Sequence, residues 1–506
     1  MAQQSNKEGP FLIGVDAGTE SLRAGVFDLQ GNPLAFSSTA YKTTFPKPGW
    51  AEQNPQDWWK ALGKSVKNSI SEADISSSSV AAICLDTTCC SVVALDENGD
   101  PLRPCLIWMD LRSAPQTEKV LATGDKALRV NSNGQGPVSA EWMIPKSLWI
   151  KENEPDLFEK AATICEFQDY MNLHLTGRKC ASINNVSARW HYDRSQGGIP
   201  ETMLEKLGLG DLSEKWPGDV LDLGETIGGL TPKAAEHLGL PKELPVIQGG
   251  ADAFIGMVGL GVVKPGSLAF ITGSSHLQLG LSDKAFNGTG VWGTYCDALL
   301  PGMHAVEGGQ TSTGSVVNWL KKLYGVEDYQ TLNREAEQLP PGSEGLIVQE
   351  HFQGNRTPHT DPLSRGVFHG LTLKHERAHL FRAVIEGVSF GSELILETMG
   401  NNGFKPDRIV MAGGATRSPL WLQIHADVSN LPLTITKVPD APSLGCAILA
   451  ATGAGLFPDV STAVDEMVQV DRLVEPNSEV HQQYHPFYEN YKETYHSMKK
   501  LRKGLE

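Results

Sequence analysis

The chain opens with two short apolar runs that are separated by a polar turn. Residues 11–15 and 22–28 are rich in β-forming side chains, and Gly, Thr, Glu and Ser lie between them. Residues 268–281 repeat this layout, with an apolar run, a Thr-Gly-Ser-Ser turn and a second apolar run. This weak internal duplication predicts two domains of similar architecture that face each other.

Three long segments have the pattern of helices. Residues 55–71 follow Asn54 and begin with Pro55, which are a cap and a first residue typical of a helix start. The large apolar side chains that share one face of this segment are Trp58, Leu62 and Val66. Residues 375–399 continue a helical pattern over a longer stretch, and residues 441–457 are small enough for close packing.

Polar residues interrupt the apolar pattern at several places. Residues 80–96 are β-like but contain the polar patch 86–90, and residues 182–193 are polar enough to predict a loop. In residues 106–112 the alternate positions are occupied by Trp108, Asp110 and Arg112. On a strand these three would share one face, and an aromatic, an acid and a base together suit the binding of a sugar.

A Gly-rich turn lies near the end of the chain. The apolar run 409–412 leads into Gly413 and Gly414, and a helical pattern starts at about Pro419. Glycine has no side chain, so a flat ligand can lie close to the backbone at such a turn.

Composition limits the kinds of partner. The net charge of −16 argues against nucleic acid, because phosphate neutralisation needs clustered Lys and Arg. The eight cysteines contain no CxxC and indicate reduced thiols of a cytoplasmic protein. The first residues lack the features of a signal peptide, and no apolar run is long enough to span a membrane. We therefore expect a cytoplasmic protein with neither a membrane nor a nucleic-acid partner.

The length of the chain predicts more than one core. A chain of 506 residues exceeds the size at which one hydrophobic core keeps growing. We place the two expected domains at residues 1–247 and 248–506.

One carboxylate lies in an unusual setting. Asp252 follows Gly249, Gly250 and Ala251 inside the small and apolar stretch 245–276. Burial of an ionised carboxylate is costly unless it is paired, hydrogen-bonded or open to a cleft. Asp252 is thus a candidate general base, and the alternative is an Asp that caps a helix starting at residue 253. This stretch alone leaves both open.

The first polar turn has the residue types of an anion site. Backbone N–H groups in such a turn can form an anion-binding nest, and an acid at its start can hold hydrated Mg²⁺. The residues concerned are Asp16, Gly18, Thr19, Ser21 and Arg23. An ordinary hairpin with a polar turn remains the alternative.

Four motifs in sequence then point to one family. These are GVDAGTESLRAGVFD, QGGADAFIGMVGLG, AFITGSSHLQL and AGGATRSPLWLQIHAD. Together they resemble the FGGY-type carbohydrate kinases, the group that includes glycerol kinase, xylulokinase and ribulokinase, over residues 11–457. The resemblance implies an α/β fold with two actin- and hexokinase-like (ribonuclease H-like) domains, and with ATP and sugar in the cleft between them.

The resemblance also implies roles for individual residues. Asp16 would hold Mg²⁺ and Asp252 would be the catalytic base. The residues that would contact ATP are Gly18, Thr19, Glu20, Ser21 and Arg23 in the first phosphate loop, Thr272, Gly273 and Ser274 in the second, and Gly413, Gly414, Ala415 and Arg417 at the adenosine. The order Thr-Gly-Ser-Ser in the second loop and the Ala at position 415 both depart from the family pattern.

The sugar-facing positions suggest a subgroup. Glycerol kinases have Arg-Glu and xylulokinases have Met-His where this chain has Cys89-Cys90, and overall it is more similar to ribulokinase-like pentulose kinases. Candidate sugar contacts are Cys90, Trp108, Asp110, Glu141 and Asp252, each with a structural alternative: core positions for Cys90 and Trp108, an Asp110–Arg112 pair, and a solvated loop for Glu141. A kinase of another polyol or linear sugar, or a sensor without turnover, remains open. The sequence allows a homodimer.

Overall fold

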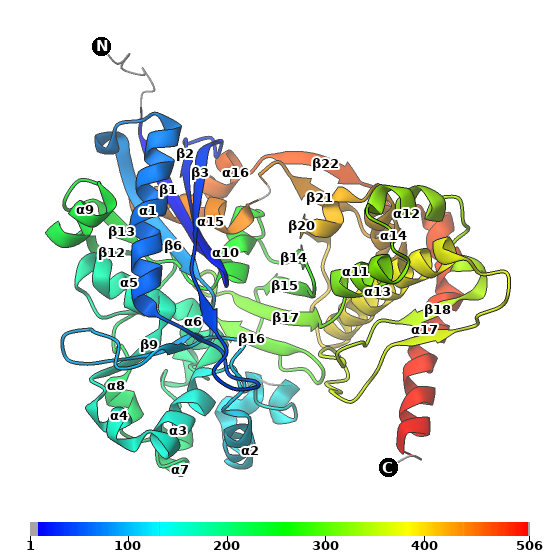
Figure 1. The fold of residues 1–506 in the computed structure, drawn as a ribbon, viewed down its shortest axis with the longest axis horizontal. Helices are drawn as coiled ribbons and strands as arrows, with labels where there is room; N and C mark the ends of the chain where they lie inside the picture. Colours follow the sequence, from blue (N-terminus) through cyan, green and yellow to red (C-terminus); the bar gives the residue numbers. More distant parts are fainter. Residues whose placement is uncertain (1–8, 131, 439, 504–506) are drawn as a thin grey trace.

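The computed structural model describes residues 9–130, 132–438 and 440–503. Two lobes lie side by side, each built on a mixed β-sheet (Figure 1). The strands of the first sheet, in spatial order, are β12 (Thr226–Gly229), β13 (Pro245–Ile247), β6 (Val80–Thr87), β1 (Phe11–Ala17), β2 (Ser21–Phe27) and β3 (Pro33–Ala40). Those of the second are β16 (Trp292–Cys296), β17 (His304–Gln310), β15 (His276–Ser282), β14 (Ser267–Thr272), β20 (Arg408–Gly413), β21 (Leu433–Thr436) and β22 (Val470–Val474).

The two sheets repeat one topology. In the first, β1 pairs antiparallel with β2 and parallel with β6, and β6 pairs parallel with β13. In the second, β14 pairs antiparallel with β15 and parallel with β20, and β20 pairs parallel with β21. The predicted internal duplication is therefore confirmed, and the hairpins β1–β2 and β14–β15 occupy equivalent places in the two lobes.

Smaller sheets and helices surround this frame. A third sheet contains β4 (Thr43–Thr44), β5 (Glu52–Gln53), β8 (Cys105–Leu106), β7 (Val92–Leu95) and β9 (Thr163–Glu166), and two short pairs are β10 (Ala181–Ser182) with β11 (Val220–Leu221) and β18 (Ile347–Gln349) with β19 (Val367–His369). The helices before residue 250 are α1 (Pro55–Ala73), α2 (Ala114–Ala122), α3 (Met143–Asn153), α4 (Pro155–Lys160), α5 (Phe167–Thr176), α6 (Ile183–Arg189), α7 (Glu201–Lys206), α8 (Leu212–Lys215) and α9 (Pro232–Leu238). Those after it are α10 (Asp252–Gly259), α11 (Gly314–Leu323), α12 (Tyr329–Ala336), α13 (Arg377–Asn401), α14 (Pro419–Ser429), α15 (Ala441–Gly453), α16 (Val460–Met467) and α17 (Ser478–Lys503).

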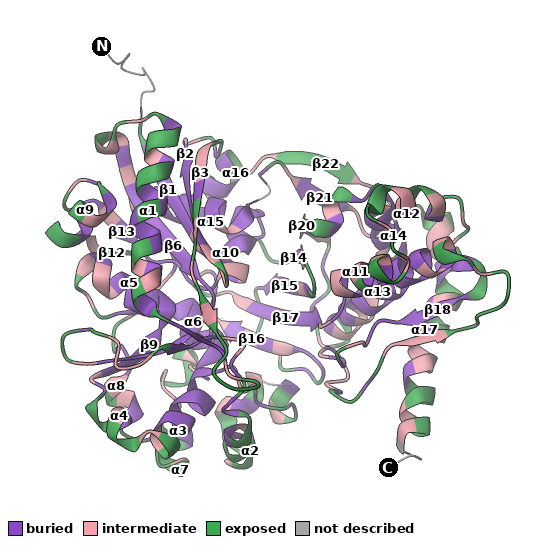
Figure 2. Ribbon diagram, in the orientation of Figure 1, coloured by how far each residue is buried: buried purple, intermediate pink, exposed green. Residues whose placement is uncertain are grey.

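Helix α15 packs against the first sheet although it lies late in the chain (Figure 1). Its small residues allow a close approach: a Cβ on Gly14 of β1 would lie 2.0 Å from the Ser443 carbonyl oxygen. Helix α10 packs on the same helix, since a Cβ on Gly259 would lie 1.9 Å from the Ala441 oxygen. The central strands and both helices are buried (Figure 2). This packing brings the starts of α10 and α15 beside the first sheet.

The local sequence signals for α1 are confirmed. The helix begins at Pro55, and the Asn54 side chain accepts a hydrogen bond from the Gln56 amide at 3.1 Å. The three residues predicted for its apolar face, Trp58, Leu62 and Val66, are fully buried. Across the described residues, no helix combines the length and apolar character needed to cross a bilayer.

Two local predictions are wrong. Residues 106–112 do not form one strand, because β8 ends at Leu106 and the Asp110 amide donates to the Ile107 oxygen in a turn. A spacing of two therefore does not place Trp108, Asp110 and Arg112 on one strand face. Residues 182–193 are not a loop either, since they contain the buried helix α6. Its polar residue Asn184 satisfies buried backbone groups, which explains the misleading composition.

Candidate active site

Four carboxylates converge where the first sheet meets α10 and α15. Asp16 and Asp86 lie opposite each other in the parallel register of β1 and β6. Directly after Asp86, the Thr87 amide donates to the Gly250 oxygen at 3.0 Å, so the segment before Asp252 continues this edge of the sheet. Asp440 is the N-cap of α15. Parallel strands present their carboxyl ends at one edge, which is the usual place for a ligand in such folds.

Burial and the crowding of these acids raise the pKa values of Asp16 and Asp86. Burial, followed by the charges of Asp440 and Asp252, raises the pKa of Asp16 to about 7. Burial, followed by the charges of Asp16 and Asp252, raises the pKa of Asp86 well above its usual range. Oδ1 of Asp86 is buried and has no hydrogen-bond partner among the described residues. A cation beside these groups would relieve both the repulsion and the lost solvation.

Asp252 is the first residue of α10, and the cap position is Ala251. Burial raises the pKa of Asp252 to about 6, while the Ala253 amide, which donates to Oδ1 at 2.7 Å, and the charge of Arg189 oppose this shift. The Ala251 amide donates to Asn184 Oδ1 at 2.9 Å, which fixes the turn before Asp252 to α6. Asp252 therefore lies inside the first turn of the helix and is not its cap, so the capping alternative is wrong in detail, and its carboxylate has the raised pKa of a candidate base.

The first hairpin turn is held by hydrogen bonds to its backbone. The Gly18 amide donates to the Ser21 oxygen at 3.0 Å, and the Tyr41 hydroxyl donates to the Gly18 oxygen. Gly18 and Ser21 are half-buried and Glu20 is exposed. The turn is therefore ordered before any ligand binds.

Side chains from other segments also reach this turn. The Trp108 Nε1 donates to Thr19 Oγ1 at 2.9 Å, and the Gln53 Nε2 donates to the Thr19 oxygen at 2.7 Å. Arg23 lies opposite Asp16 in the β1–β2 register and forms an ion pair with Asp440. The Arg23 guanidinium is therefore already partly neutralised by protein, where the sequence predicted a phosphate contact.

The second hairpin turn divides its hydroxyls between two tasks. Thr272 Oγ1 donates to the Ala412 oxygen at 2.7 Å and accepts from the Ala415 amide at 3.1 Å. Gly273 and Ser274 are exposed, and the Ser274 oxygen accepts from the Thr313 amide at 3.0 Å. Thr272 thus ties the turn to its neighbours, while the Ser274 hydroxyl faces solvent.

The Gly-rich turn after β20 stands beside this hairpin. Gly413 has a φ of 96°, and a Cβ there would lie 1.9 Å from the Thr272 oxygen. Gly414 and Arg417 are exposed. The side chain of Ala415 is buried in the core of the second lobe. The fold therefore accommodates Ala415, where the family often has a third glycine, by packing its side chain into the core.

The predicted sugar residue Asp110 is in a buried ion pair. Its carboxylate accepts from the Ala51 amide at 2.6 Å and from Arg112 Nη2 at 2.7 Å. Both side chains are inaccessible to solvent. The structure places Asp110 in the structural pair that the sequence left open as its alternative.

The other sugar candidates lie around a buried lysine. Cys90 is buried, whereas Trp108 and Glu141 are half-buried. The Lys146 ammonium donates to the Cys90 oxygen at 2.6 Å, and the charge of Glu141 acts on the same ammonium. These residues therefore form one neighbourhood, which Trp108 joins to the first hairpin through Thr19.

Sequence reasoning missed a charged group opposite them. Arg189 of α6 forms an ion pair with Glu307 of β17 at 2.9 Å and donates to the Tyr295 hydroxyl at 3.1 Å. Burial opposes ionisation of Glu307, but Arg189 holds its pKa below the usual value. Arg189 also acts on Asp252. Residues 182–193 were predicted to be a loop but contain helix α6. The spacing of three between Val186 and Arg189 was the only sequence signal for a helix face that carries Arg189.

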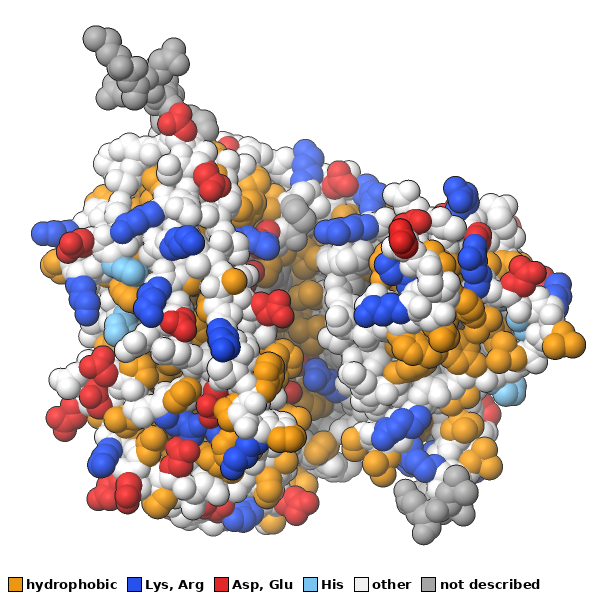
Figure 3. Space-filling view, in the orientation of Figure 1, with side chains coloured by type: hydrophobic (Ala, Val, Ile, Leu, Met, Phe, Trp, Pro, Cys, Tyr) orange, Lys and Arg blue, Asp and Glu red, His pale blue; other side chains and the backbone are white. Residues whose placement is uncertain are grey.

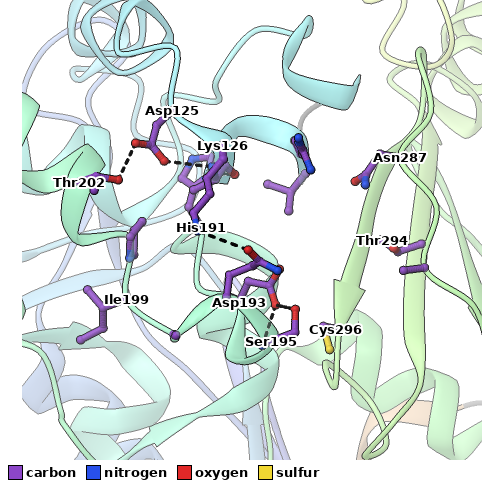
Figure 4. A pocket seen from close by; sticks show the side chains of 18 of the residues that line it. Asp125, Lys126, His191, Asp193, Ser195, Ile199, Thr202, Asn287, Thr294 and Cys296 are labelled. Carbon is purple, nitrogen blue, oxygen red and sulfur yellow. Dashed lines mark hydrogen bonds between the residues drawn. The ribbon is translucent and has the colours of Figure 1, made fainter.

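The space between the lobes is open on the face shown in Figure 3, which is hollowed along their boundary. A separate cavity of about 430 Å³ is lined by some of the residues within 125–130 and 191–202, and by Ala285, Asn287, Thr294, Cys296 and His304. Figure 4 shows Asp193 and Ser195 on one side of it and Asn287 and Thr294 on the other. None of the four converging carboxylates belongs to its described lining, so the two sites are distinct.

Two sheets of matching topology, with equivalent hairpins on either side of an inter-lobe cleft, define the actin- and hexokinase-like class of two-domain α/β proteins. Residues 11–259 match the N-terminal domain and residues 268–454 the C-terminal domain of the FGGY family of carbohydrate kinases. The chain belongs to this family and is a carbohydrate kinase, a phosphotransferase with an alcohol acceptor.

Individual relatives agree with this assignment. An FGGY carbohydrate kinase domain-containing protein of Xenopus laevis is 30% identical and covers 96% of both chains. A ribulokinase of Shouchella clausii is 31% identical over 95% of this chain and 94% of its own. The solved structure of a xylulose kinase from Rhodospirillum rubrum superposes with a TM-score of 0.87 at 27% identity, covering 97% of this chain and 99% of that one.

Proposed function

We propose that the protein transfers the γ-phosphoryl group of ATP to a hydroxyl of a pentulose such as D-ribulose or xylulose. Relatives named ribulokinase and xylulose kinase support the substrate class. The observation that carries the proposal is the position of Asp252. Burial raises the pKa of this carboxylate to about 6, and the carboxylate interacts with Asp16 from the first hairpin and with Arg189 from α6.

Asp252 accepts the proton of the attacking hydroxyl and aims its oxygen at the phosphorus atom. The transition state of phosphoryl transfer is loose, so the protein mainly positions groups and neutralises charge. The amides of Gly18 and Gly273 already donate within their own turns, so other backbone N–H groups of the two hairpin turns, with the exposed Ser274 hydroxyl, bind phosphate oxygens. The Gly413–Gly414 turn, Ala415 and Arg417 receive the adenosine. Closure of the two lobes excludes water and limits wasteful hydrolysis of ATP.

The residues at the carboxylate cluster fit Mg²⁺. No group of three or more His, Cys, Asp or Glu side chains in the described ranges is arranged to hold a metal ion by itself. Mg²⁺ usually keeps several waters and is bound through one or two carboxylates and substrate phosphates. Asp16 would hold it through water, and the bound ion would neutralise the phosphates. The pKa of Asp16, raised to about 7 by burial and neighbouring acids, fits a group that needs a cation to ionise.

The sugar contacts are divided between the two lobes. The first lobe contributes Cys90, Trp108, Glu141 and Arg189 to the sugar site, and the second lobe contributes Glu307 of β17. Asp110 acts indirectly: its pair with Arg112 shapes the turn that carries Trp108. An ion pair that joins α6 to β17 couples sugar binding to the arrangement of the lobes. We also propose that the N-terminal domain comprises residues 1–247 and the C-terminal domain residues 248–506.

A substrate panel tests the function. Purified protein with Mg²⁺ and ATP is assayed by coupled ADP detection against D-ribulose, L-ribulose, D-xylulose, glycerol, erythritol, ribitol and gluconate. We expect a pentulose to give the highest kcat/KM. If a polyol gave the highest kcat/KM, the proposed substrate class would change from pentuloses to polyols. Binding of sugar and ATP in isothermal titration without ADP formation would refute the kinase proposal in favour of a sensor.

A further inference from the structure

Two adjacent thiols lie at the turn between β6 and β7. Cys90 Sγ is 3.8 Å from Cys89 Sγ and donates a hydrogen bond to it. Cys89 is half-buried, whereas Cys90 is only 1% exposed. A reagent can therefore reach Cys89 first, with the second thiol directly beneath it.

The turn that carries the thiols is fixed on both sides. The Lys146 ammonium donates to the Cys90 oxygen at 2.6 Å, and the next amide, of Ser91, donates to Glu166 Oε2 at 2.8 Å. Cys90 has a φ of 61°, in the left-handed region that a residue with a Cβ seldom adopts. The backbone that carries the two adjacent sulfurs is thus held in place by the fold.

The pair also lies near Arg189, which we place at the sugar site. The charge of Arg189 interacts with both Cys89 and Cys90, and the same guanidinium acts on Asp252. A change at the two sulfurs would therefore occur next to the group that we assign to proton transfer. This consequence for turnover rests on the proposed function, whereas the reactivity of the thiols does not.

We propose that Cys89 and Cys90 form a modification site for low-molecular-weight disulfides, at which oxidation to a Cys89–Cys90 disulfide closes the sugar site. Two cysteine thiols and one external disulfide give one protein disulfide and two external thiols. The external disulfide is the oxidant, and each of its sulfurs leaves as a thiol.

The burial of the two thiols orders the steps. Burial, followed by the hydrogen bond to Cys89, raises the pKa of the Cys90 thiol well above its usual range, so this thiol stays protonated at first. The Cys89 sulfur, as thiolate, attacks the external disulfide, forming a mixed disulfide and releasing one thiol. Cys90 then loses its proton, attacks the Cys89 sulfur and releases the second thiol.

The product differs from the reduced pair in shape and in polarity. A disulfide brings the sulfurs to about 2.05 Å, so one or both must leave their positions beside Arg189. Adjacent Cα atoms are about 3.8 Å apart across a trans peptide, less than the usual spacing of bridged cysteines. Such a bond is strained and readily reduced, which makes the modification reversible by ordinary thiols.

The test uses the full chain and glutathione disulfide. Intact mass and peptide mapping follow the thiols, and kinase activity is measured with the pentulose that is active in the panel above. We expect the peptide with both cysteines to lose two hydrogen atoms, activity to fall at least tenfold, and dithiothreitol to restore both. Saturating pentulose should slow the modification.

Variants locate the reaction. Cys296 is also half-buried and lies outside the proposed machinery, so Cys296→Ser should remain as sensitive as the wild type. Cys90→Ser should stop at the glutathione adduct of Cys89, and whatever activity Cys89→Ser retains should be insensitive to oxidation. Differential alkylation of the wild type provides the same mapping if a variant fails to fold.

Each contrary outcome has one meaning. If both thiols remain alkylatable after oxidation, or if only Cys296 reacts, the modification site is refuted. If the disulfide forms while pentulose turnover is unchanged, the closure of the sugar site is refuted. Because the mass readout does not need a substrate, absence of kinase activity with every sugar would count against the proposed function and not against the thiol chemistry.

Discussion

Replacement of Asp252 by Asn tests the role that the mechanism depends on. The substitution keeps the shape of the side chain and an oxygen that can accept from the Ala253 amide, now at 2.7 Å from Oδ1. It removes the basic carboxylate. We therefore expect kcat to fall by roughly two to four powers of ten, the usual contribution of a general base. This corresponds to about 3–5 kcal/mol of lost transition-state stabilisation.

The pKa of Asp252 gives the same prediction a second readout. Burial raises that pKa to about 6, and a base must be unprotonated to accept a proton. The kcat/KM of the wild type should therefore fall as the pH decreases below about 6, by roughly tenfold for each further unit. Asp252→Asn should lack this limb of the pH profile.

The assay compares three proteins by coupled ADP detection between pH 5 and 8, with nucleotide affinity measured by isothermal titration. Asp465→Asn is the matched control, because this carboxylate lies in an exposed pair with Lys264 at 3.1 Å. It should retain full turnover. ATP affinity of Asp252→Asn should change little. Near-normal turnover of Asp252→Asn, with its low-pH limb intact, would refute the assignment of the base.

Three further substitutions, one of them with a matched control, test the surrounding site. Asp16→Asn should abolish the Mg²⁺-dependent reaction yet raise the melting temperature of the ligand-free protein above pH 7. The pKa of Asp16 is raised from 3.8 to about 7, so ionisation of this carboxyl destabilises the folded wild type as the pH rises through that window. Equal melting temperatures of the two proteins by calorimetry at pH 8 would contradict this. Gly413→Ala should lower the unfolding free energy by roughly 1–3 kcal/mol and raise the KM for ATP. A Cβ on Gly414 meets no atom within 4 Å, so Gly414→Ala should melt like the wild type, and equal losses in both would disprove the strain argument. Glu307→Gln leaves Arg189 buried without its carboxylate partner and should cost about 3–5 kcal/mol while raising the pentulose KM, whereas an unchanged KM would remove Glu307 from the sugar site.

Much of the frame was predictable because its signals are local. Asn54 and Pro55 started α1 where the sequence predicted, and the two hairpins formed at the predicted turns. Glycines before Asp252 marked a place where the backbone turns sharply, and the carboxylate does begin a helix there. Such signals need only backbone preferences and neighbours a few residues away.

The spacing of residues along the sequence was misleading where both a strand and a turn can place a polar residue at every second position. Alternate positions 108, 110 and 112 fit a strand, but the Asp110 carboxylate caps a turn through the Arg112 amide at 3.1 Å. Likewise the polar residues of 182–193 predicted a loop, although the Asn184 side chain forms hydrogen bonds with the buried backbone of Ala251 and Ala298. From sequence alone a polar side chain is expected to face solvent, and only the structure shows whether it has a buried hydrogen-bond partner.

The sequence by itself determined the family, the two-lobed class of fold and the positions of Asp16 and Asp252 on their turns. Only the tertiary structure decided that Asp86 stands beside Asp16, that Arg23 pairs with Asp440 and that Arg189 reaches Glu307. These partners are far apart in sequence, and the pairing of β1 with β6 and the packing of α6, α10 and α15 bring them together. Their charges interact strongly because that packing removes water from between them.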